Sequence, residues 1–414
     1  MEEVEREENQ QVLTVLELLK QASHDLQSNP SRQPTESNSS AIKALLELET
    51  ESDTILSDPS LFQLSQHLSY LKTLVESLHK TCGYSLRSFL RRRVSTHQIV
   101  RVAESIESEI QAWIDREFID SLVKALHGLV LESPNLVEES ELLINLLIQF
   151  QNRVSQGFDR ELQDLVLKAG IFNELEMCLI NSNLSNKIRE ESAFAIEGLI
   201  RFNKNVFVGQ VLMGPTIKAL ISMSSSSSLK VLCSLIKSIK SPLVDEIESN
   251  NEIPSIIGFL RSDNLAVQVL GFDCVLEIGY FGRKEAIEAM IKEDIVKILV
   301  GLQRSELGGD LIDVRECETE ENRGEKQGKT EENRGEKTGE NRGKKQGKRE
   351  NYLERHPFAS CLARFAVQLE VGEGLRQREK RSFKQEILRR IKDASFSDAE
   401  VATIQAEVLW GSFL

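Results

Sequence analysis

The chain of 414 residues is poor in the features of β-structure and of membrane-spanning segments. Aromatic residues make up only 6% of it, and the alternation of apolar and polar residues typical of strands is scarce. Its longest uncharged run, residues 205–217, is interrupted by glycine and proline, and it is shorter than the roughly 20 apolar residues that a spanning helix needs. Because Leu, Ile, Glu, Lys and Ser dominate instead, we expect an elongated, all-α protein.

Residue patterns for catalysis are also missing. The histidines have no metal-ligand spacing, no serine or cysteine lies in a nucleophile turn, and no glycine-rich phosphate loop follows a strand. The sequence therefore predicts no enzymatic activity, no cofactor and no bound metal.

The six cysteines have no close pairing, and four fall within apolar helical stretches, which predicts reduced and mostly buried thiols. The first residues are mostly acidic, whereas a signal or transit peptide begins with positive charge, so we expect no targeting peptide. A formal net charge of −14 argues against general nucleic-acid binding, which needs a basic surface. Together these features predict a cytoplasmic protein, with the nucleus as a second location.

One nearly complete helical repeat is present at residues 251–279. Pro254 fits the first turn of a short helix whose apolar residues have helical spacing. The polar turn at residues 262–264 can cap a longer helix, in which small Gly271 and Cys274 allow close approach between helices. Two helices this apolar cannot bury their surfaces against each other alone. Neighbouring copies must therefore stack and share a core.

Further copies of this unit flank it. The order of short helix, polar turn and longer helix recurs in residues 169–200, and two more units open at residues 213 and 293. The aligned positions are 44, 38 and 42 residues apart, at Ile171, Pro215, Ile253 and Ile295. This period is close to the ~40 to 47 residues of armadillo and related helical repeats.

Residues 120–303 resemble the armadillo domain of plant proteins related to U-box armadillo ubiquitin ligases and vacuolar armadillo adaptors. A plant subgroup without a U-box is the most similar, on the runs QAWIDRE (111–117), GFDRELQD (157–164) and FAVQLEVGEGLRQREK (365–380). Residues 60–118 have a continuous helical pattern where a U-box would need a compact segment. The resemblance implies an armadillo-type right-handed α-solenoid with an N-terminal helical region and a C-terminal helical cap.

The pattern divides the chain into four parts. Residues 1–119 form an N-terminal helical region with a Ser, Pro and Asn-rich linker at residues 29–40, and residues 120–315 hold the armadillo repeats. Residues 316–350 are a charged, low-complexity insert with almost no apolar residue, which predicts a flexible tether. Residues 351–414 contain three helical patterns, which we expect to form a terminal repeat that caps the solenoid.

Several polar features have both a functional and a purely structural interpretation, and the sequence leaves both open. The basic stretches from Arg87 to Arg101 and from Arg376 to Lys392 are candidates for membrane contact or solvated faces of amphipathic helices. The basic run at residues 344–349 is a nuclear-import signal or a solvated part of the insert. The serine run at residues 224–228 is a phosphorylation cluster or a flexible loop.

The repeats predict a non-catalytic scaffold that binds a peptide or helix of a protein partner in the concave groove of the solenoid. The alternative is a component of ubiquitination or of peripheral membrane trafficking that acts through a recruited enzyme or a lipid surface. Carriage of nuclear signals, as in importins, uses an Asn near the end of each long helix, but the matching positions hold Gly198 and Ile278.

The longer helices line the concave side in armadillo proteins, so their carboxylates are the candidate partner-binding residues. The acidic balance of the chain favours a partner segment with basic character. The candidates are Glu190, Glu191, Glu197, Asp273 and Glu277.

We expect removal of the insert, residues 316–350, to leave the fold intact, because a segment with little to bury adds no packing. The shortened chain should keep the thermal midpoint of the full chain and its helix content per folded residue, both measured by circular dichroism. A large loss of thermal stability would show that the insert packs against the folded parts.

Overall fold

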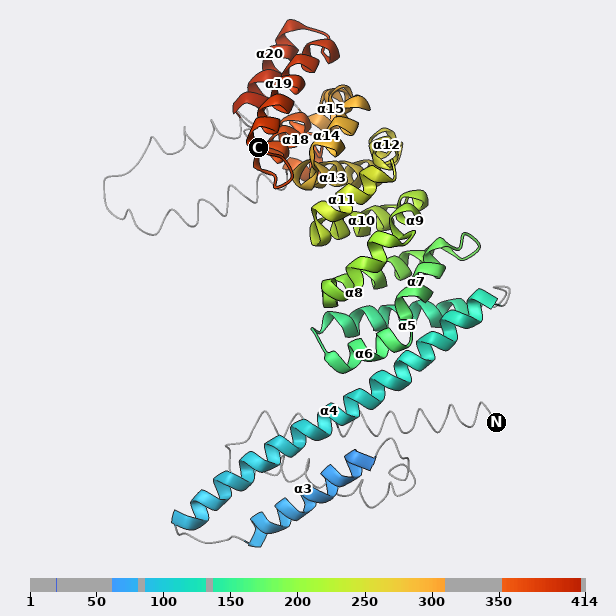
Figure 1. The fold of residues 1–414 in the computed structure, drawn as a ribbon, viewed down its shortest axis with the longest axis vertical. Helices are drawn as coiled ribbons and strands as arrows, with labels where there is room; N and C mark the ends of the chain where they lie inside the picture. The colour runs from blue at the N-terminus through green and yellow to red at the C-terminus, as the bar shows by residue number, and fades with distance from the viewer. Residues whose placement is uncertain (1–19, 21–61, 81–85, 132–136, 310–351, 411–414) are drawn as a thin grey trace, which may run out of the picture. The chain divides into compact units, whose positions relative to one another are not determined.

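The computed structural model describes residue 20 and residues 62–80, 86–131, 137–309 and 352–410 (Figure 1). The predicted linker and charged insert, the first predicted helices, and the thiols of Cys82 and Cys317 lie outside these residues. Within them every regular element is a helix, so the prediction of an all-α protein is confirmed. Contacts divide the chain into two compact units, residues 1–132 with 159–171, and residues 133–158 with 172–414.

The first unit is built on one long helix. Helix α4 (Leu86–Leu131) has 46 residues, and α3 (Phe62–Lys80) and α6 (Arg160–Lys168) pack against it. On α3, the side chains that are buried against α4 recur at helical spacing. They are Leu64, Leu68, Leu71 and Leu74.

The boundary expected after residue 119 falls inside α4. The apolar stripe that begins at Val102 of α4 continues through the buried residues Ile119, Leu122 and Leu126. No break in this pattern ends the helix after residue 119. The first unit accordingly runs on to residue 132.

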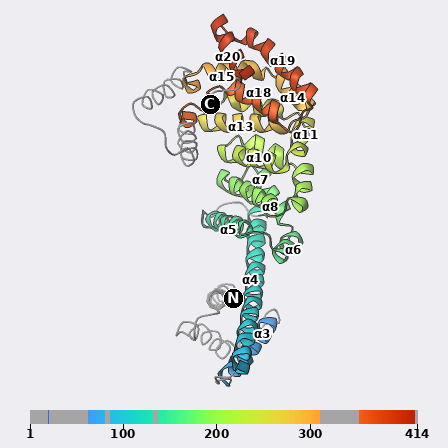
Figure 2. The ribbon, with the colours of Figure 1, turned by 90° about the vertical axis from the view of Figure 1, so that its left-hand side faces the viewer.

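The second unit is a stack of helices (Figure 2). In chain order these are α5 (Val137–Ser155), α7 (Ile171–Ile180), α8 (Asn186–Met213), α9 (Thr216–Met223), α10 (Ser226–Ile239), α11 (Ser241–Ser249), α12 (Ile253–Gly258), η2 (Phe259–Arg261), α13 (Leu265–Phe281), α14 (Lys284–Lys292), α15 (Ile295–Arg304), η3 (Glu306–Gly308), α18 (Cys361–Val371), α19 (Gln377–Ala394) and α20 (Asp398–Trp410).

Each full repeat of the second unit contains three helices. Helices α11, α12 and α13 make one complete repeat, with η2 as the continuation of α12. In the repeat before it, the first helix is the end of α8, residues 204–213, which non-helical backbone at Asn203 (φ −152°, ψ 89°) separates from the rest of α8. The sequence predicted pairs of helices. The additional first helices, such as α11 and α14 with nine residues each, were missed because the sequence pattern was interpreted as two helices per repeat.

The second helix of each repeat begins where the predicted period places it. Pro254 lies in the first turn of α12, and the Asn264 side chain caps α13 by accepting hydrogen bonds from the backbone N–H groups of Ala266 and Val267. The second helices start at Ile171 (α7), Thr216 (α9), Ile253 (α12) and Ile295 (α15).

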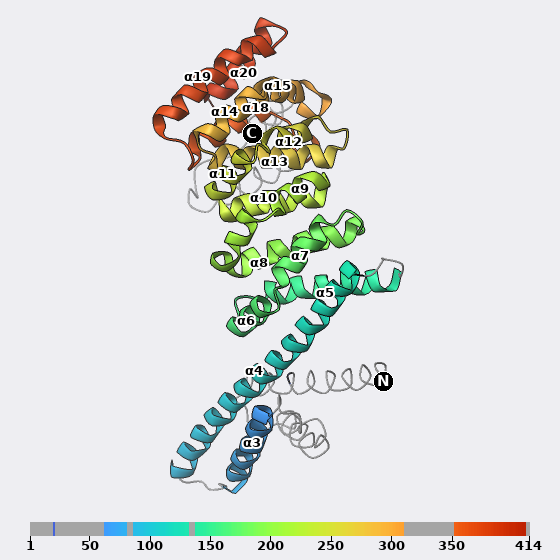
Figure 3. The same cartoon turned by 45° about the vertical axis from the view of Figure 1, so that its right-hand side comes forward.

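The third helices lie side by side in one layer (Figures 1 and 3). We call this the third-helix layer: residues 186–202 of α8, followed by α10, α13 and α18. Its inner members are covered on two flanks, since α10 packs between α8 and α13, and α13 packs between α10 and α18. Neighbouring repeats therefore share a core, as the sequence predicted, and the predicted armadillo-type solenoid is confirmed.

The third helix of the last repeat comes from beyond the charged insert. Helix α18 packs against α13 and α15, and a Cβ on Gly279 of α13 would lie only 3.1 Å from the ring of Phe365. Phe358, just before α18, meets Phe272 of α13 edge-on with 6.1 Å between ring centroids. The predicted division into repeats up to residue 315 and a cap from residue 351 does not follow this packing, because the apolar face of α18 completes the repeat of α14 and α15.

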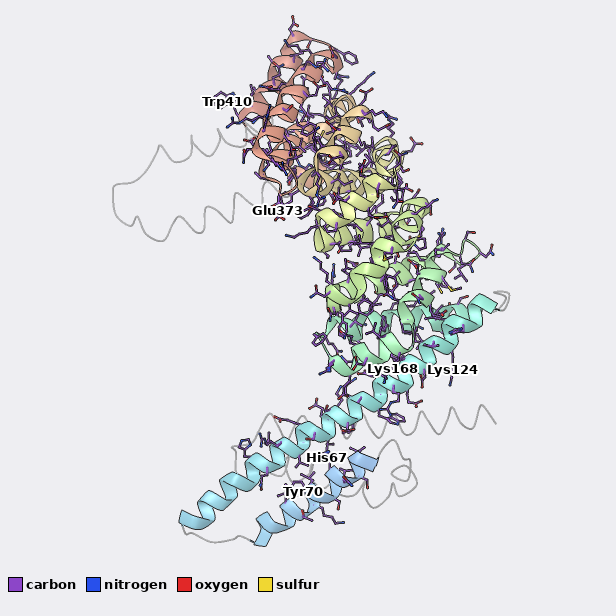
Figure 4. The ribbon with its side chains drawn as sticks, in the orientation of Figure 1. His67, Tyr70, Lys124, Lys168, Glu373 and Trp410 are labelled. Atoms are coloured by element: carbon purple, nitrogen blue, oxygen red, sulfur yellow. The ribbon has the colours of Figure 1, made fainter. Side chains whose placement is uncertain are left out.

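Helices α19 and α20 end the stack and form the C-terminal helical cap. Helix α19 packs on α15, and α20 packs on α18. The buried carboxylate of Glu407 in α20 accepts hydrogen bonds from Gln303 (2.7 Å) and Ser360 (3.1 Å), so it joins the cap to α15 and to the start of α18. Trp410, at the end of α20 in Figure 4, is 84% exposed.

Gly271 tests the close packing inside one repeat. A Cβ at this position would lie 2.8 Å from the Cβ of Phe259, which is too close without a backbone shift. We expect Gly271→Ala to destabilise the fold by about 1 to 3 kcal/mol, and Gly271→Trp by more. The free energy of unfolding from chemical denaturation measures the change.

Gly301 is the matched control, because it also lies inside a helix and a Cβ there meets nothing within 4 Å. Gly301→Ala should leave stability unchanged or raise it by about 0.5 to 1 kcal/mol through the lower entropy of the unfolded chain. Equal effects at the two positions would contradict the close contact between α13 and η2.

Candidate functional site

All five predicted carboxylates lie on the third-helix layer, but in two groups. Glu190, Glu191 and Glu197 are on α8, and Asp273 and Glu277 are on α13. Helix α10 packs between these two helices. The structure therefore brings the carboxylates onto one layer without forming a single acidic cluster.

The α8 carboxylates are engaged with neighbouring helices. The Glu191 side chain accepts a hydrogen bond of 2.9 Å from Gln151 of α5. Glu197 is only 8% exposed and pairs at 2.5 Å with Arg201, which also donates to Ser234 of α10 at 3.2 Å. Glu190 is half-buried on the same helix. This group is thus acidic but partly neutralised.

Helix α10 adds a basic row that the sequence analysis missed. Lys230 and Lys237 are exposed and lie seven residues apart, so they share one face of the helix. Lys237 forms an ion pair of 3.4 Å with Glu277 of α13. The seven-residue spacing of Lys230 and Lys237 is visible in the sequence, but only the packing shows that this face of α10 lies between the carboxylates of α8 and α13.

Asp273 lies half-buried beside the next basic residue, Arg364 of α18. Burial raises the pKa of Asp273, and the charges of Arg364 and Lys237 act in the opposite direction. Arg364 also stacks over the ring of Phe272 at 4.8 Å and donates a hydrogen bond of 2.7 Å to the carbonyl of Pro357. Along the layer the side chains described above alternate in sign: carboxylates on α8, lysines on α10, carboxylates on α13 and Arg364 on α18. Helix α8 also carries Lys187, Arg189 and Arg201, and α18 also carries Glu370.

The positions that correspond to the importin asparagines are closed. Ile278 is fully buried, and a Cβ on Gly198 would lie 3.1 Å from the side chain of Val154. An amide at position 278 would be buried, and one at position 198 would have to displace the side chain of Val154.

The serine run at residues 224–228 is the start of a helix. Ser225 is the N-cap of α10 and forms a reciprocal capping box with Ser228, which is fully buried. The prediction of a flexible loop is therefore wrong. Ser226, Ser227 and Ser228 lie in the first turn of α10, where the hydroxyls of Ser225 and Ser228 accept hydrogen bonds from backbone N–H groups that a helix start leaves open.

The stretch from Arg376 to Lys392 forms the start and most of α19, and three of its eight basic residues, Lys384, Arg389 and Arg390, form ion pairs with acids. Lys384 pairs with Glu370 at 2.8 Å, and Arg390 pairs with Asp294 at 3.1 Å and with Glu386 at 2.7 Å. Hydrogen bonds from Arg389 and Arg390 lower the pKa of Glu386 to about 2. Near the same helix, Glu373 pairs with Lys240 of the neighbouring repeats at 3.2 Å (Figure 4).

The four described cysteines, Cys178, Cys233, Cys274 and Cys361, are buried free thiols, as predicted. Among the described residues, no group of three or more His, Cys, Asp or Glu side chains has the arrangement of a metal site. None of the described helices is by itself both long and apolar enough to cross a membrane; one bent pair, Asn186–Met213 with Thr216–Met223 at 73°, reaches that length and composition together.

No protein-family model matches the chain, and no curated protein matches it. Among solved structures, the designed armadillo repeat protein YIII(Dq)4CqI is similar to it with 14% identity and a TM-score of 0.39, over 70% of this chain and 98% of that one. The designed armadillo repeat protein YIII(Dq.V1)4CPAF in complex with the peptide (KR)4 has 15% identity and a TM-score of 0.39, over 70% and 98%. The repeat fold rests on the helix order and packing of this chain rather than on these likenesses.

Asp273 provides a test of the electrostatics of the layer. Because burial raises its folded-state pKa, the stability that its protonated form contributes is fully present below the unfolded pKa of about 4 and is lost as the pH rises through the folded pKa. Asp273→Asn removes the charge at nearly constant size. We therefore expect the thermal midpoint of the variant to rise relative to that of the unsubstituted protein between pH 4 and neutral pH.

The exposed Asp263→Asn substitution controls for the loss of one negative charge outside the layer. If Asp273→Asn instead loses most stability at neutral pH, the attraction of Arg364 and Lys237 outweighs the cost of burial.

Proposed function

We propose that this protein is a non-catalytic scaffold whose third-helix layer binds a peptide or helix of a protein partner. The alternating rows of charge on four consecutive helices are the observation that carries this proposal. A stack of repeats offers an extended surface of this kind, and extended surfaces of repeat proteins are used for binding.

One ion pair between the rows leaves the layer able to accept a partner. Lys237 is 57% exposed in its pair with Glu277, which is 23% exposed, and exposed pairs contribute only about 0 to 1 kcal/mol. A partner can therefore replace this pair with its own charges at low cost. The pair of Arg201 and Glu197 lies within α8, and the Glu197 side chain is only 10% exposed, so we expect this pair to stay in place.

The row order suggests the chemistry of the partner. Packed helices lie about 8 to 10 Å apart, and an extended chain advances about 3.3 Å per residue, so a bound segment would pass one helix about every three residues. We propose a segment with basic residues opposite α8 and α13 and an acidic residue opposite α10. Charge complementarity of this kind sets the register and the rate of association more than the affinity.

The resemblance to plant U-box armadillo proteins and vacuolar adaptors supports an alternative role. In it, the scaffold recruits an enzyme of ubiquitination or works in peripheral membrane trafficking. The ion pairs of Lys384, Arg389 and Arg390 on α19 reduce the number of basic side chains that α19 can offer to a lipid surface. We propose the cytoplasm as the place of action, with the nucleus second.

Charge neutralisation by amide substitution tests the binding face. Partners are first identified by proximity labelling in the native cell, and their affinity for the purified full chain is then measured at low salt. We expect the combined variant Glu190→Gln, Glu191→Gln, Glu197→Gln, Asp273→Asn and Glu277→Gln to bind at least about tenfold more weakly, because the charges opposite the basic positions of the partner are removed.

A second five-site variant controls for the change in net charge. It carries Asp263→Asn, Glu248→Gln, Glu285→Gln, Glu288→Gln and Glu293→Gln, all outside the third-helix layer. If both variants bind equally well, or lose affinity equally, the layer is not the binding face. Hydrolase, transferase or autoubiquitination activity in the purified protein would contradict the non-catalytic role.

A further inference from the structure

Two cysteines from adjacent repeats meet within the third-helix layer. Cys233 is on α10 and Cys274 is on α13, and their thiols are hydrogen-bonded to each other. The sulfur of Cys274 also lies 3.7 Å from the carbonyl oxygen of Leu229, one helical turn before Cys233 on α10. The Cys274 side chain thus lies against the turn of α10 that carries Cys233.

The two thiols differ in their acidity in a way that suits stepwise chemistry. The hydrogen bond from Cys274 lowers the pKa of Cys233, burial opposes this, and the charge of Lys237 assists it. The pKa of Cys274 is raised by the same hydrogen bond and by burial. Since the thiolate is the reactive form of cysteine, Cys233 is the nucleophile of the pair.

The remaining buried thiols provide a contrast inside the same chain. Burial raises the pKa of Cys178 and of Cys361 to about 12, and Glu174 contributes in the same direction at Cys178. Neither has a second thiol as its hydrogen-bond partner: the Cys361 thiol donates to the carbonyl of Leu299 at 3.1 Å. These two thiols should therefore remain inert under conditions in which Cys233 reacts.

The pair is almost closed to solvent. Cys233 is 6% exposed and Cys274 is fully buried. Lys237 follows Cys233 by one helical turn, Glu277 follows Cys274 by three residues, and these two side chains form the 3.4 Å ion pair across the helices. Because an exposed ion pair contributes little, its side chains can move aside and admit a small oxidant.

We propose that Cys233 and Cys274 are an oxidation site at which hydrogen peroxide forms a disulfide between α10 and α13. The Cys233 thiolate attacks one peroxide oxygen, the O–O bond breaks, and protonation of the leaving hydroxide gives water and a sulfenic acid on Cys233. The Cys274 thiol then attacks the Cys233 sulfur, the S–O bond breaks, and a second water leaves. Overall, two thiols and one peroxide give one disulfide and two waters.

The disulfide would join two adjacent repeats at the centre of the layer. Asp273 and Glu277 flank Cys274, and Lys237 lies one turn from Cys233, so oxidation would fix the spacing between a basic and an acidic row. The oxidation chemistry itself does not depend on the proposed partner binding.

Peptide mapping of the full chain tests this proposal. The reduced protein is treated with hydrogen peroxide, remaining thiols are blocked with N-ethylmaleimide, and tryptic peptides are analysed by mass spectrometry. We expect residues 231–237 to be linked to residues 262–283, with a mass 2 Da below the sum of the two peptides and reversal by a reducing agent. Cys178 and Cys361 should be found blocked by maleimide only after unfolding.

Two variants separate the steps. Cys274→Ser should stop the reaction at a sulfenic acid on Cys233, trapped by dimedone, whereas Cys233→Ser should leave Cys274 unoxidised. Cys274→Ser keeps a hydrogen-bond donor beside Cys233, Cys233→Ala repeats the second test if serine disturbs the buried site, and circular dichroism confirms the fold. Absence of the linked peptides from oxidised, folded protein, or oxidation of Cys178 or Cys361 before Cys233, would overturn the proposal.

Discussion

Burial of the third helices on two flanks is the constraint on which the second unit depends. In α13, Phe272, Val275 and Ile278 are at most 1% exposed, and the helix packs against α10 on one side and α18 on the other. A large apolar side chain contributes about 1.5 to 3 kcal/mol when it is buried, so exposure of one flank costs several kcal/mol, a large part of the net stability of a typical domain. Adjacent repeats therefore stabilise one another.

The same constraint explains the place of the insert and of the charges. Helix α18 returns to the stack after the charged insert because its apolar face is needed beside α13, and closing a long loop adds only about 0.6 kcal/mol for each doubling of its length. Most charged side chains of the third helices lie on the remaining faces, whereas Glu197 is buried beside Arg201. Cys233 and Cys274 lie where two rows and two repeats meet.

The sequence predicted those elements whose signals are local. The starts of the second helices at Ile171, Ile253 and Ile295 and the cap at Asn264 follow from nearby apolar, proline and polar residues. First helices such as α11 were missed although α11 buries as many residues as the predicted α12, because the pattern was interpreted as two helices per repeat. The membership of α18 in the last repeat is a long-range contact, which local pattern does not contain.

The candidate site was predictable to a similar degree. Placing Glu197 and Glu277 on the third helices needed only the repeat pattern. Their ion pairs with Arg201 and Lys237 depend on side-chain geometry and helix packing, and the basic row of α10 becomes significant only between two acidic neighbours.

Native-state hydrogen exchange tests the shared core most directly: amides of α13 and α18 should open with the same free energy, close to that of global unfolding of the second unit. Fast exchange in α18 while α13 remains protected would contradict a core shared by these two helices.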